Sequence, residues 1–286
     1  MKPPYPILLT ALLLASCAPA PASVSTAFPT LAAESAATSA QPTPPIFTHT
    51  PAPAIITPPN GSWQIQYTGE INLNLDVAIY NLDLFDTSSA TIADLRARGV
   101  FVMCYFSAGS REDWRPDADK FPAEVLGNDY EGWSGEKWLD IRKLDLLAPI
   151  MNARLDLASQ KGCDGVDPDN IQGFTNDTGF PLSYDDQLQY NIWLSESAHA
   201  RGLSIGLKNN FEQIRDLLPY FDWQLHEECF QYHECEMLLP FLEAGKPVFN
   251  IEYTLPTSEF CPQSNALGLI SIRKNLILDA FIESCK

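Results

Sequence analysis

The chain has 286 residues and a formal net charge of −18 at pH 7, because 36 Asp and Glu outnumber 18 Lys and Arg. So negative a chain repels nucleic acid and attracts a polycation. We therefore exclude a nucleic-acid partner and expect a cationic one.

Residues 1–16 have the layout of a secretory signal. One cation, Lys2, precedes an apolar run at residues 7–14 that is too short for a stable membrane span. Residues 14–17, Leu-Ala-Ser-Cys, resemble a bacterial lipobox, which implies cleavage before Cys17 and lipid attachment to it. More than one acyl chain gives stable anchoring. We expect a lipid-anchored protein of the bacterial cell envelope that faces outside the cytoplasm. An ordinary signal peptide is the alternative.

Residues 17–60 are rich in Pro, Ala, Ser and Thr, with Glu34 as their only charge. Such a segment cannot bury a core, and its prolines favour extended polyproline II, so we interpret it as a tether. From Gly61 the composition changes to aromatic residues, Gly and periodic apolar runs. Residues 61–286 are long enough for one domain of the barrel or large α/β type, and we expect a monomer.

Seven cysteines are present, and six remain if Cys17 carries lipid. An even number in an exported chain predicts disulfides. Spacing favours Cys229–Cys235, while Cys261–Cys285 would fasten the C-terminal segment. Cys104 either pairs with Cys163 or stays a buried thiol. A zinc site is disfavoured, because the chain has no Cys-x-x-Cys pair and its four histidines do not cluster with cysteines. We expect neither a metal nor a cofactor.

Short apolar runs alternate with amphipathic stretches along the domain. We expect strands at residues 77–84, 100–106, 138–141, 165–167, 203–207, 221–225, 247–252 and 267–272. We expect helices at residues 89–98, 122–126, 146–161, 184–201, 211–218 and 237–244. Strands that alternate with helices predict parallel βα units, and eight units in this length fit a (β/α)8 barrel. A doubly wound sheet is the alternative.

The most informative stretch is residues 163–173, Cys-Asp-Gly-Val-Asp-Pro-Asp-Asn-Ile-Gln-Gly. Asp167 and Asp169 face the same way if the strand continues, and Pro168 ends the ladder. A second acid pair, Glu227 and Glu228, follows the strand at 221–225. Carboxylates from two different strand ends are what glycoside hydrolysis requires.

Polar residues follow nearly every predicted strand, and in a barrel the carboxyl ends of the strands surround the site. The residues that we expect there are Asp83, Asp86, Tyr105, Ser107, Asp140, Asp167, Asp169, Asn170, Lys208, Asn209, Glu227, Glu228, Glu252 and Tyr253.

From Trp63 to Cys285 the chain resembles the family 114 glycoside hydrolases, the endo-α-1,4-polygalactosaminidase-like group. The segments that carry the resemblance are Tyr-Asn-Leu-Asp-Leu-Phe-Asp at 80–86, Cys-Tyr-Phe-Ser-Ala-Gly-Ser-Arg-Glu-Asp-Trp at 104–114, Trp-Leu-Asp-Ile-Arg at 138–142, Gly-Cys-Asp-Gly-Val-Asp-Pro-Asp-Asn at 162–170, Gly-Leu-Lys-Asn at 206–209, Glu-Glu-Cys-Phe-Gln-Tyr at 227–232 and Ile-Arg-Lys-Asn at 272–275. The resemblance implies a (β/α)8 barrel that hydrolyses α-1,4-linked galactosamine polymer, endo-acting and with retention.

The resemblance also implies residue roles. The family's nucleophile falls on Asp169 and its acid/base on Glu227. Two positions depart from the family pattern: Asp167 stands where Glu is common, and His226 stands where Asn is expected.

From the residues themselves, we expect Asn170 or Lys208 to hold Asp169 ionised, and neighbouring acids such as Glu228 to raise the pKa of Glu227. The residues that we expect to bind sugar amines are Asp83, Asp86, Asp140 and Glu252, and those that we expect to stack on sugar rings are Tyr105, Trp114 and Tyr253. The partner is then a cationic amino-sugar polysaccharide.

Two other functions remain open. One is a non-catalytic polysaccharide-binding lipoprotein on the same fold. The other is a metal-dependent deacetylase, which is disfavoured because the Asp-Pro-Asp-Asn segment contains no histidine.

Overall fold

The computed structural model describes residues 54–285. The predicted signal, Cys17 and most of the predicted tether lie outside these residues. Within residues 54–285, no helix has both the length and the apolar character that a membrane crossing requires.

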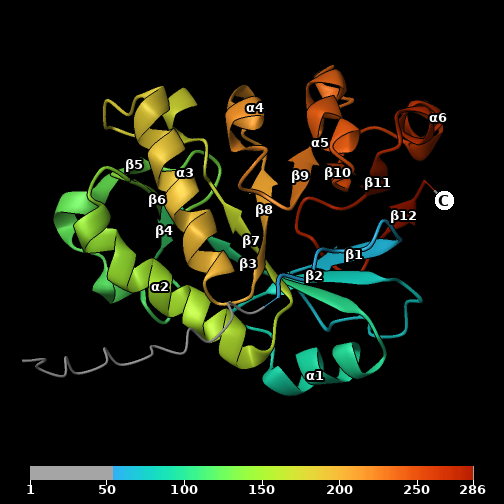
Figure 1. Cartoon of the computed structure of the whole chain (residues 1–286), viewed down its shortest axis with the longest axis horizontal. Helices are drawn as coiled ribbons and strands as arrows, with labels where there is room; N and C mark the ends of the chain where they lie inside the picture. Colours follow the sequence, from blue (N-terminus) through green and yellow to red (C-terminus); the bar gives the residue numbers. More distant parts are fainter. Residues whose placement is uncertain (1–53, 286) are drawn as a thin grey trace, which may run out of the picture. The chain divides into compact units, whose positions relative to one another are not determined.

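A curled sheet of nine strands forms the centre of the fold (Figure 1). Its strands, in sheet order, are β1 Trp63–Gln66, β2 Ile79–Asp83, β3 Phe101–Ser107, β7 Gly165–Asp169, β8 Ser204–Lys208, β9 Trp223–Glu227, β10 Val248–Glu252, β11 Ile270–Arg273 and β12 Glu283–Ser284. All neighbours pair in parallel except β11 and β12, which pair antiparallel. The carboxyl ends of the parallel strands therefore share one edge of the sheet.

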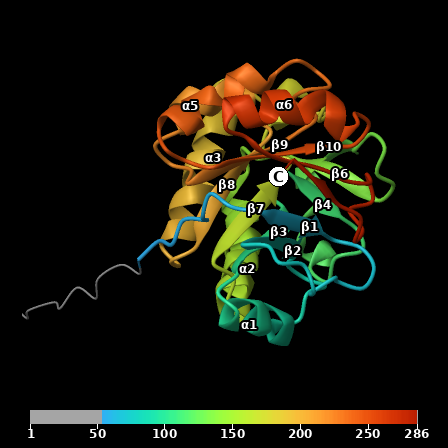
Figure 2. The same ribbon diagram turned by 90° about the vertical axis from the view of Figure 1, so that its right-hand side faces the viewer.

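Helices cover the outer face of this sheet, as Figure 2 shows from the side. They are α1 Ser89–Ala97, α2 Leu144–Lys161, α3 Tyr184–His199, α4 Ile214–Leu217, α5 Leu239–Glu243 and α6 Thr257–Leu267. Local sequence explains their ends: Ser183 and Asp186 form a capping box on α3, and Gly162 ends α2 with φ 86°. The predicted helix at 122–126 is only a 3₁₀ turn at Ala123–Val125, and α6 was not predicted.

One predicted strand belongs to a different sheet. The apolar run at 138–141 overlaps β6 Glu136–Leu139, which pairs antiparallel with β4 Ser110–Glu112 and β5 Leu126–Asp129. These three strands form a small sheet between β3 and α2, called here the inserted sheet. In the parallel sheet β3 pairs directly with β7, so the place expected for that strand is absent, and the eighth parallel strand is β1, which pairs with β2 and was not predicted. An apolar run indicates a strand without indicating its neighbour, and this accounts for the error.

Large aromatic side chains fill the concave side of the curled sheet. Trp63 of β1, Trp223 of β9 and Phe249 of β10 pack together and are almost completely buried. A Cβ at Gly206 would lie 2.2 Å from the Trp223 ring, so only glycine leaves room for this indole. Trp63 Nε1 donates a 3.0 Å hydrogen bond to the Ile270 carbonyl of β11, which brings the first and the last parallel strands together.

Three disulfides join the described residues. Cys229–Cys235 and Cys261–Cys285 confirm the predicted pairs, and Cys104 pairs with Cys163. Cys104–Cys163 links β3 to the segment before β7, and Cys229–Cys235 closes the loop that follows β9.

Candidate active site

A pocket of about 480 Å³ opens at the carboxyl ends of the parallel strands. Three parts of the chain line it: the strand ends, the inserted sheet with its loops, and a loop after β11. The lining residues are Tyr67, Thr68, Asp83, Asp86, Tyr105, Glu112, Trp114, Arg115, Tyr130, Trp133, Glu136, Asp169, Asn170, Lys208, Asn209, Glu227, Glu228, Tyr253, Leu276, Ile277 and Leu278. Seven of them are acids and two, Arg115 and Lys208, are cations, so the formal charge is 2 − 7 = −5 with every group ionised. A cationic ligand is attracted to such a lining.

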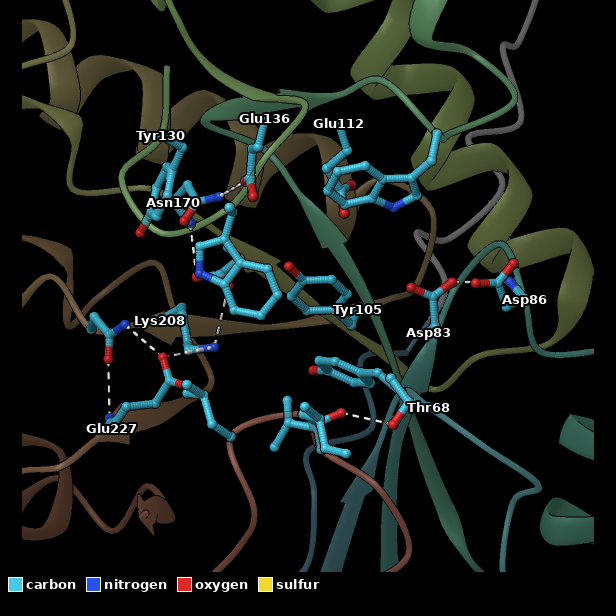
Figure 3. Close-up of a pocket in the computed structure, with 18 of the residues that line it drawn as sticks. Thr68, Asp83, Asp86, Tyr105, Glu112, Tyr130, Glu136, Asn170, Lys208 and Glu227 are labelled. Carbon is cyan, nitrogen blue, oxygen red and sulfur yellow. Dashed lines mark hydrogen bonds and ion pairs between the residues drawn. The ribbon is translucent and has the colours of Figure 1, made fainter. Parts of the chain in front are cut away.

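Lys208 contacts both predicted catalytic acids, and Figure 3 labels it beside one of them, Glu227. Its Nζ lies 3.4 Å from Asp169 Oδ2 and 3.3 Å from Glu227 Oε2, so these two oxygens are at most 3.4 + 3.3 = 6.7 Å apart. Only 1% of Lys208 is exposed. Burial alone would lower the pKa of Lys208, but the surrounding carboxylates Asp169, Glu227 and Asp167 outweigh it and raise that pKa. Lys208 is therefore a permanent cation between two acids.

Besides Lys208, two hydrogen-bond donors, Asn209 and Tyr253, fix the Glu227 carboxylate. Asn209 Nδ2 donates to Oε2 at 3.1 Å, and Asn209 Oδ1 accepts the Glu227 backbone N–H at 3.1 Å. Tyr253 donates its hydroxyl to Oε1. Burial raises the pKa of Glu227, but Lys208 and these donors overcome burial and lower that pKa below its ordinary value. This corrects the expectation that neighbouring acids raise it.

Backbone turns aim these side chains. The first residue after each of β7, β8 and β9 has a left-handed backbone conformation. These residues are Asn170, Asn209 and Glu228, with φ values of 62°, 56° and 60°. Asparagine tolerates this conformation better than most residues, whereas for Glu228 it is strained. The repeated turn ends each strand abruptly, so Asp169, Lys208 and Glu227 stand at the same edge of the sheet.

Asn170 links the strand ends to the inserted sheet. Its backbone N–H donates to Asp169 Oδ1 at 2.8 Å, and its Nδ2 donates to Glu136 Oε1 at 2.8 Å. A Cβ at Gly109 would lie 1.7 Å from the Asn170 carbonyl oxygen, so glycine is required where the two chains pass.

Arg115 contacts three acids on the opposite side of the pocket. Its guanidinium makes two 2.8 Å hydrogen bonds to Glu112 and a 2.7 Å ion pair with Asp83, and Asp86 lies 3.7 Å away. Asp83 and Asp86 do line the pocket as expected, but Asp83 is already occupied by Arg115.

Several expected site residues lie outside the pocket. Asp140 is 2% exposed and binds Arg142, and Glu252 is fully buried and accepts hydrogen bonds from Asn250 and the backbone of Phe230. Neither lines the pocket, so we no longer assign them to sugar amines. Buried residues that support the lining from behind are Ser107, Asp167 and His226.

Asp167 lies directly behind the catalytic acids. Its Oδ2 accepts hydrogen bonds from Asn81 at 2.7 Å and Tyr67 at 3.3 Å, while its Oδ1 has no partner among the described residues. Burial raises the pKa of Asp167 to about 6, with a further contribution from Asp169.

Sequence reasoning missed the pocket wall that the inserted sheet and the terminal loop provide. Residues of the pocket that were not predicted are Tyr67, Thr68, Glu112, Arg115, Tyr130, Trp133, Glu136, Leu276, Ile277 and Leu278. One signal pointed to part of this wall, because the resembling segment at 104–114 contains Glu112 and the predicted Trp114. Nothing in the local pattern marks Tyr130 or Glu136, which reach the pocket only through the pairing of the inserted sheet.

The arrangement suits acid–base and nucleophilic chemistry on a sugar. Two carboxylates face the pocket, with a buried cation between them. The two oxygens that contact this cation lie at most 6.7 Å apart. Among residues 54–285, no group of three or more His, Cys, Asp or Glu is placed to hold a metal ion.

Comparisons with known proteins place this geometry in a family. Glycoside-hydrolase family GH114 matches residues 47–286. The chain is similar to a crystal structure of Aspergillus fumigatus Ega3 in complex with galactosamine, with 40% identity, a TM-score of 0.76, and coverage of 82% of this chain and 97% of that one. The glycoside hydrolase domain of PelA from Pseudomonas aeruginosa shares the fold at 16% identity, with a TM-score of 0.63 and coverage of 78% and 98%. A search of curated protein sequences found no match. With a family match over most of its length, the chain belongs to glycoside-hydrolase family GH114 and is a glycoside hydrolase.

Proposed function

We propose that this protein hydrolyses α-1,4-linked, galactosamine-containing polysaccharide, endo-acting and with retention at the anomeric carbon. The observation that carries the proposal is the pair Asp169 and Glu227, both in contact with Lys208 in an acidic pocket. The similarity to Ega3, whose structure holds galactosamine, supports an amino-sugar substrate.

Asp169 is the proposed nucleophile. Its Oδ1 accepts the Asn170 backbone N–H, and its Oδ2 faces Lys208, so one oxygen is held in place while the other reacts. Attack of this oxygen on the anomeric carbon forms a glycosyl ester as the bond to the leaving oxygen breaks. The strand-end turn at Asn170 places the carboxylate at the pocket surface, where 17% of the side chain is exposed.

Glu227 is the proposed acid/base. In the first step it gives a proton to the leaving oxygen, and in the second it takes a proton from the water that cleaves the ester. The low pKa of Glu227 suits the second step, because the ionised form is the base. The first step requires the protonated minority, so acid pH should favour it. The limit of 6.7 Å between the acids includes the separation of about 5–5.5 Å typical of retaining enzymes.

Digestion of fully deacetylated α-1,4-galactosamine polymer tests the proposal. Early products of mixed intermediate size indicate endo cleavage, and NMR of the first product gives the anomeric configuration. Release of monomer alone contradicts the endo mode, inversion contradicts the nucleophile, and no cleavage contradicts the activity.

The fold of the domain is proposed to be a (β/α)8 barrel. Eight strands, β1, β2, β3 and β7 to β11, follow one another in parallel around the sheet. Closure between β1 and β11 is supported by the Trp63 bond to Ile270 and by Lys274, whose Nζ donates to Gln64 at 2.9 Å.

The location is proposed from sequence alone. Cleavage before Cys17 and lipidation of Cys17 would anchor the domain to the bacterial envelope, with residues 17–60 as the tether. Cys17→Ser should move the protein from the membrane fraction to the soluble fraction. If the variant stays in the membrane fraction, the anchor is not Cys17.

A further inference from the structure

The inserted sheet places two carboxylates opposite each other. Glu112 of β4 and Glu136 of β6 are register partners in an antiparallel pair, where facing like charges are unfavourable. Only 3% of Glu112 and 6% of Glu136 is exposed, so water screens them poorly. A position of this kind requires a compensating cation.

Arg115 compensates one member of the pair. It forms two hydrogen bonds with Glu112 and none with Glu136. Among residues 54–285, no Lys, Arg or His forms an ion pair with Glu136. Its Oε1 accepts hydrogen bonds from Asn170 and Ser110, and its Oε2 accepts none from the described residues. Glu136 nevertheless lines the pocket, where a ligand can reach it.

Glu136 stands close to the reacting centre. Asn170 bridges the two carboxylates, since its backbone N–H binds Asp169 and its side-chain amide binds Glu136. Figure 3 shows Glu136, Asn170 and Tyr130 together on one side of the pocket, with Lys208 and Glu227 on another. A sugar whose anomeric carbon faces Asp169 carries its amine on the adjacent carbon, within the same small space.

The electrostatics of Glu136 agree with a missing cation. Burial raises its pKa to about 7, Glu112 and Asp169 add to the effect, and hydrogen bonds from Ser110 and Asn170 oppose it. An ammonium group beside the carboxylate would return it to the ionised form.

We propose that Glu136 recognises the C2 ammonium group of the sugar unit bound against Asp169, and so selects free amino sugars over sugars without a free amine. This inference rests on the proposed function and adds to it the residue that recognises the amine. The inserted sheet would then supply the substrate specificity of a site whose chemistry lies on the strand ends.

The test compares Glu136→Gln with the wild type. Glutamine keeps an oxygen that accepts the Asn170 and Ser110 bonds and removes the charge. Calorimetry measures the binding of galactosamine and of galactose, which differ at C2, and kinetics measure KM and kcat on deacetylated α-1,4-galactosamine polymer. Asp129→Asn is the matched control, because Asp129 lies on β5 of the same sheet, exposed and outside the pocket.

We expect Glu136→Gln to weaken galactosamine binding and raise KM by about ten- to a hundredfold, the contribution of a hydrogen bond to a charged group. Galactose binding and kcat should change far less, and Asp129→Asn should behave like the wild type. In the wild type, KM should fall as pH rises through about 7, because Glu136 ionises there. In the variant, KM should show no such fall.

Two results would overturn the inference. Equal losses for galactosamine and galactose would mean that Glu136 only positions Asn170. Unchanged preference for galactosamine would mean that another group reads the amine. If the wild type prefers galactosamine through Glu136 but cleaves no polymer, this inference stands and the proposed function fails.

Discussion

The strand ends and the inserted sheet contribute different kinds of residue to one pocket. The strand ends provide Asp169, Lys208 and Glu227, a compact set in which each acid contacts the cation. The inserted sheet and its loops provide exposed aromatic side chains, Trp114 and Trp133, and the unpaired Glu136. Each catalytic carboxylate of the strand ends therefore contacts a cation before substrate arrives, whereas Glu136 of the inserted sheet contacts none among the described residues. We infer that the first region performs the reaction and the second selects what enters.

The largest effects should come from the strand ends. Asp169→Asn removes the nucleophile and should abolish turnover while substrate still binds. Glu227→Gln should reduce kcat by about 10²–10⁴-fold, the usual contribution of general acid–base catalysis. A substrate with a good leaving group should partly restore the first step in the Glu227 variant only, because that leaving group needs no proton.

These two variants also test the division between the regions. Steady-state kinetics and equilibrium binding measured on the same polymer separate rate from affinity. If Asp169→Asn keeps near-normal turnover, the nucleophile lies elsewhere and the comparison between the regions is wrong.

The second prediction concerns pH. Lys208, Asn209 and Tyr253 lower the pKa of Glu227, and the first step needs its protonated form. Above that pKa the protonated fraction falls about tenfold per pH unit, so kcat of the wild type, measured at saturating substrate, should decline as pH rises from the acid side. Tyr253→Phe removes one donor to the carboxylate and should move this decline to higher pH. A pH–rate profile of both proteins checks the prediction, and a decline at the same pH in both would contradict it.

Parts of the fold and site were predictable because each strand carries its own signal. Residues 165–167 and 221–225 each lead into a pair of acids at a strand end, and parallel pairing brings such ends together. β1 and two strands of the inserted sheet, β4 and β5, lack such a signal, and the run at 138–141 marks β6 without its partners. Buried Gln64 and Gln66 give β1 an alternating polar pattern, and β5 reads Leu-Gly-Asn-Asp, which resembles a turn. Glu136 reaches the pocket only through its register with Glu112, which no local pattern specifies.

The third prediction addresses the inserted sheet. Trp133 lines the pocket with 49% of its surface exposed, and such an indole offers a face for a sugar ring. Trp133→Ala should raise KM by about two- to tenfold with little change in kcat, in line with about 0.5–1.5 kcal/mol for a ring contact. Trp133→Phe keeps a ring and should recover most of the affinity. A fall in kcat of the size expected for Glu227→Gln would place Trp133 in the reaction itself.

The smallest effect on rate should come from Asp167, which lies on a strand end but behind the pocket. Its pKa is raised from 3.8 to about 6, chiefly by burial, so the folded state prefers the protonated acid. That contribution to stability is fully present below pH 3.8 and is lost as pH rises through about 6. Asp167→Asn is neutral at every pH and keeps the shape. It should therefore raise the free energy of unfolding near pH 7.5 by up to about 3 kcal/mol, and the gain should vanish near pH 3.

Turnover should fall only mildly, because Asn81 and Tyr67 still find an oxygen in the side chain. Thermal unfolding at the two pH values, with kinetics at neutral pH, measures both effects. An unstable variant at pH 7.5 would show that the charge of Asp167 stabilises the strand ends through Lys208, and an inactive one would move the nucleophile from Asp169 to Asp167.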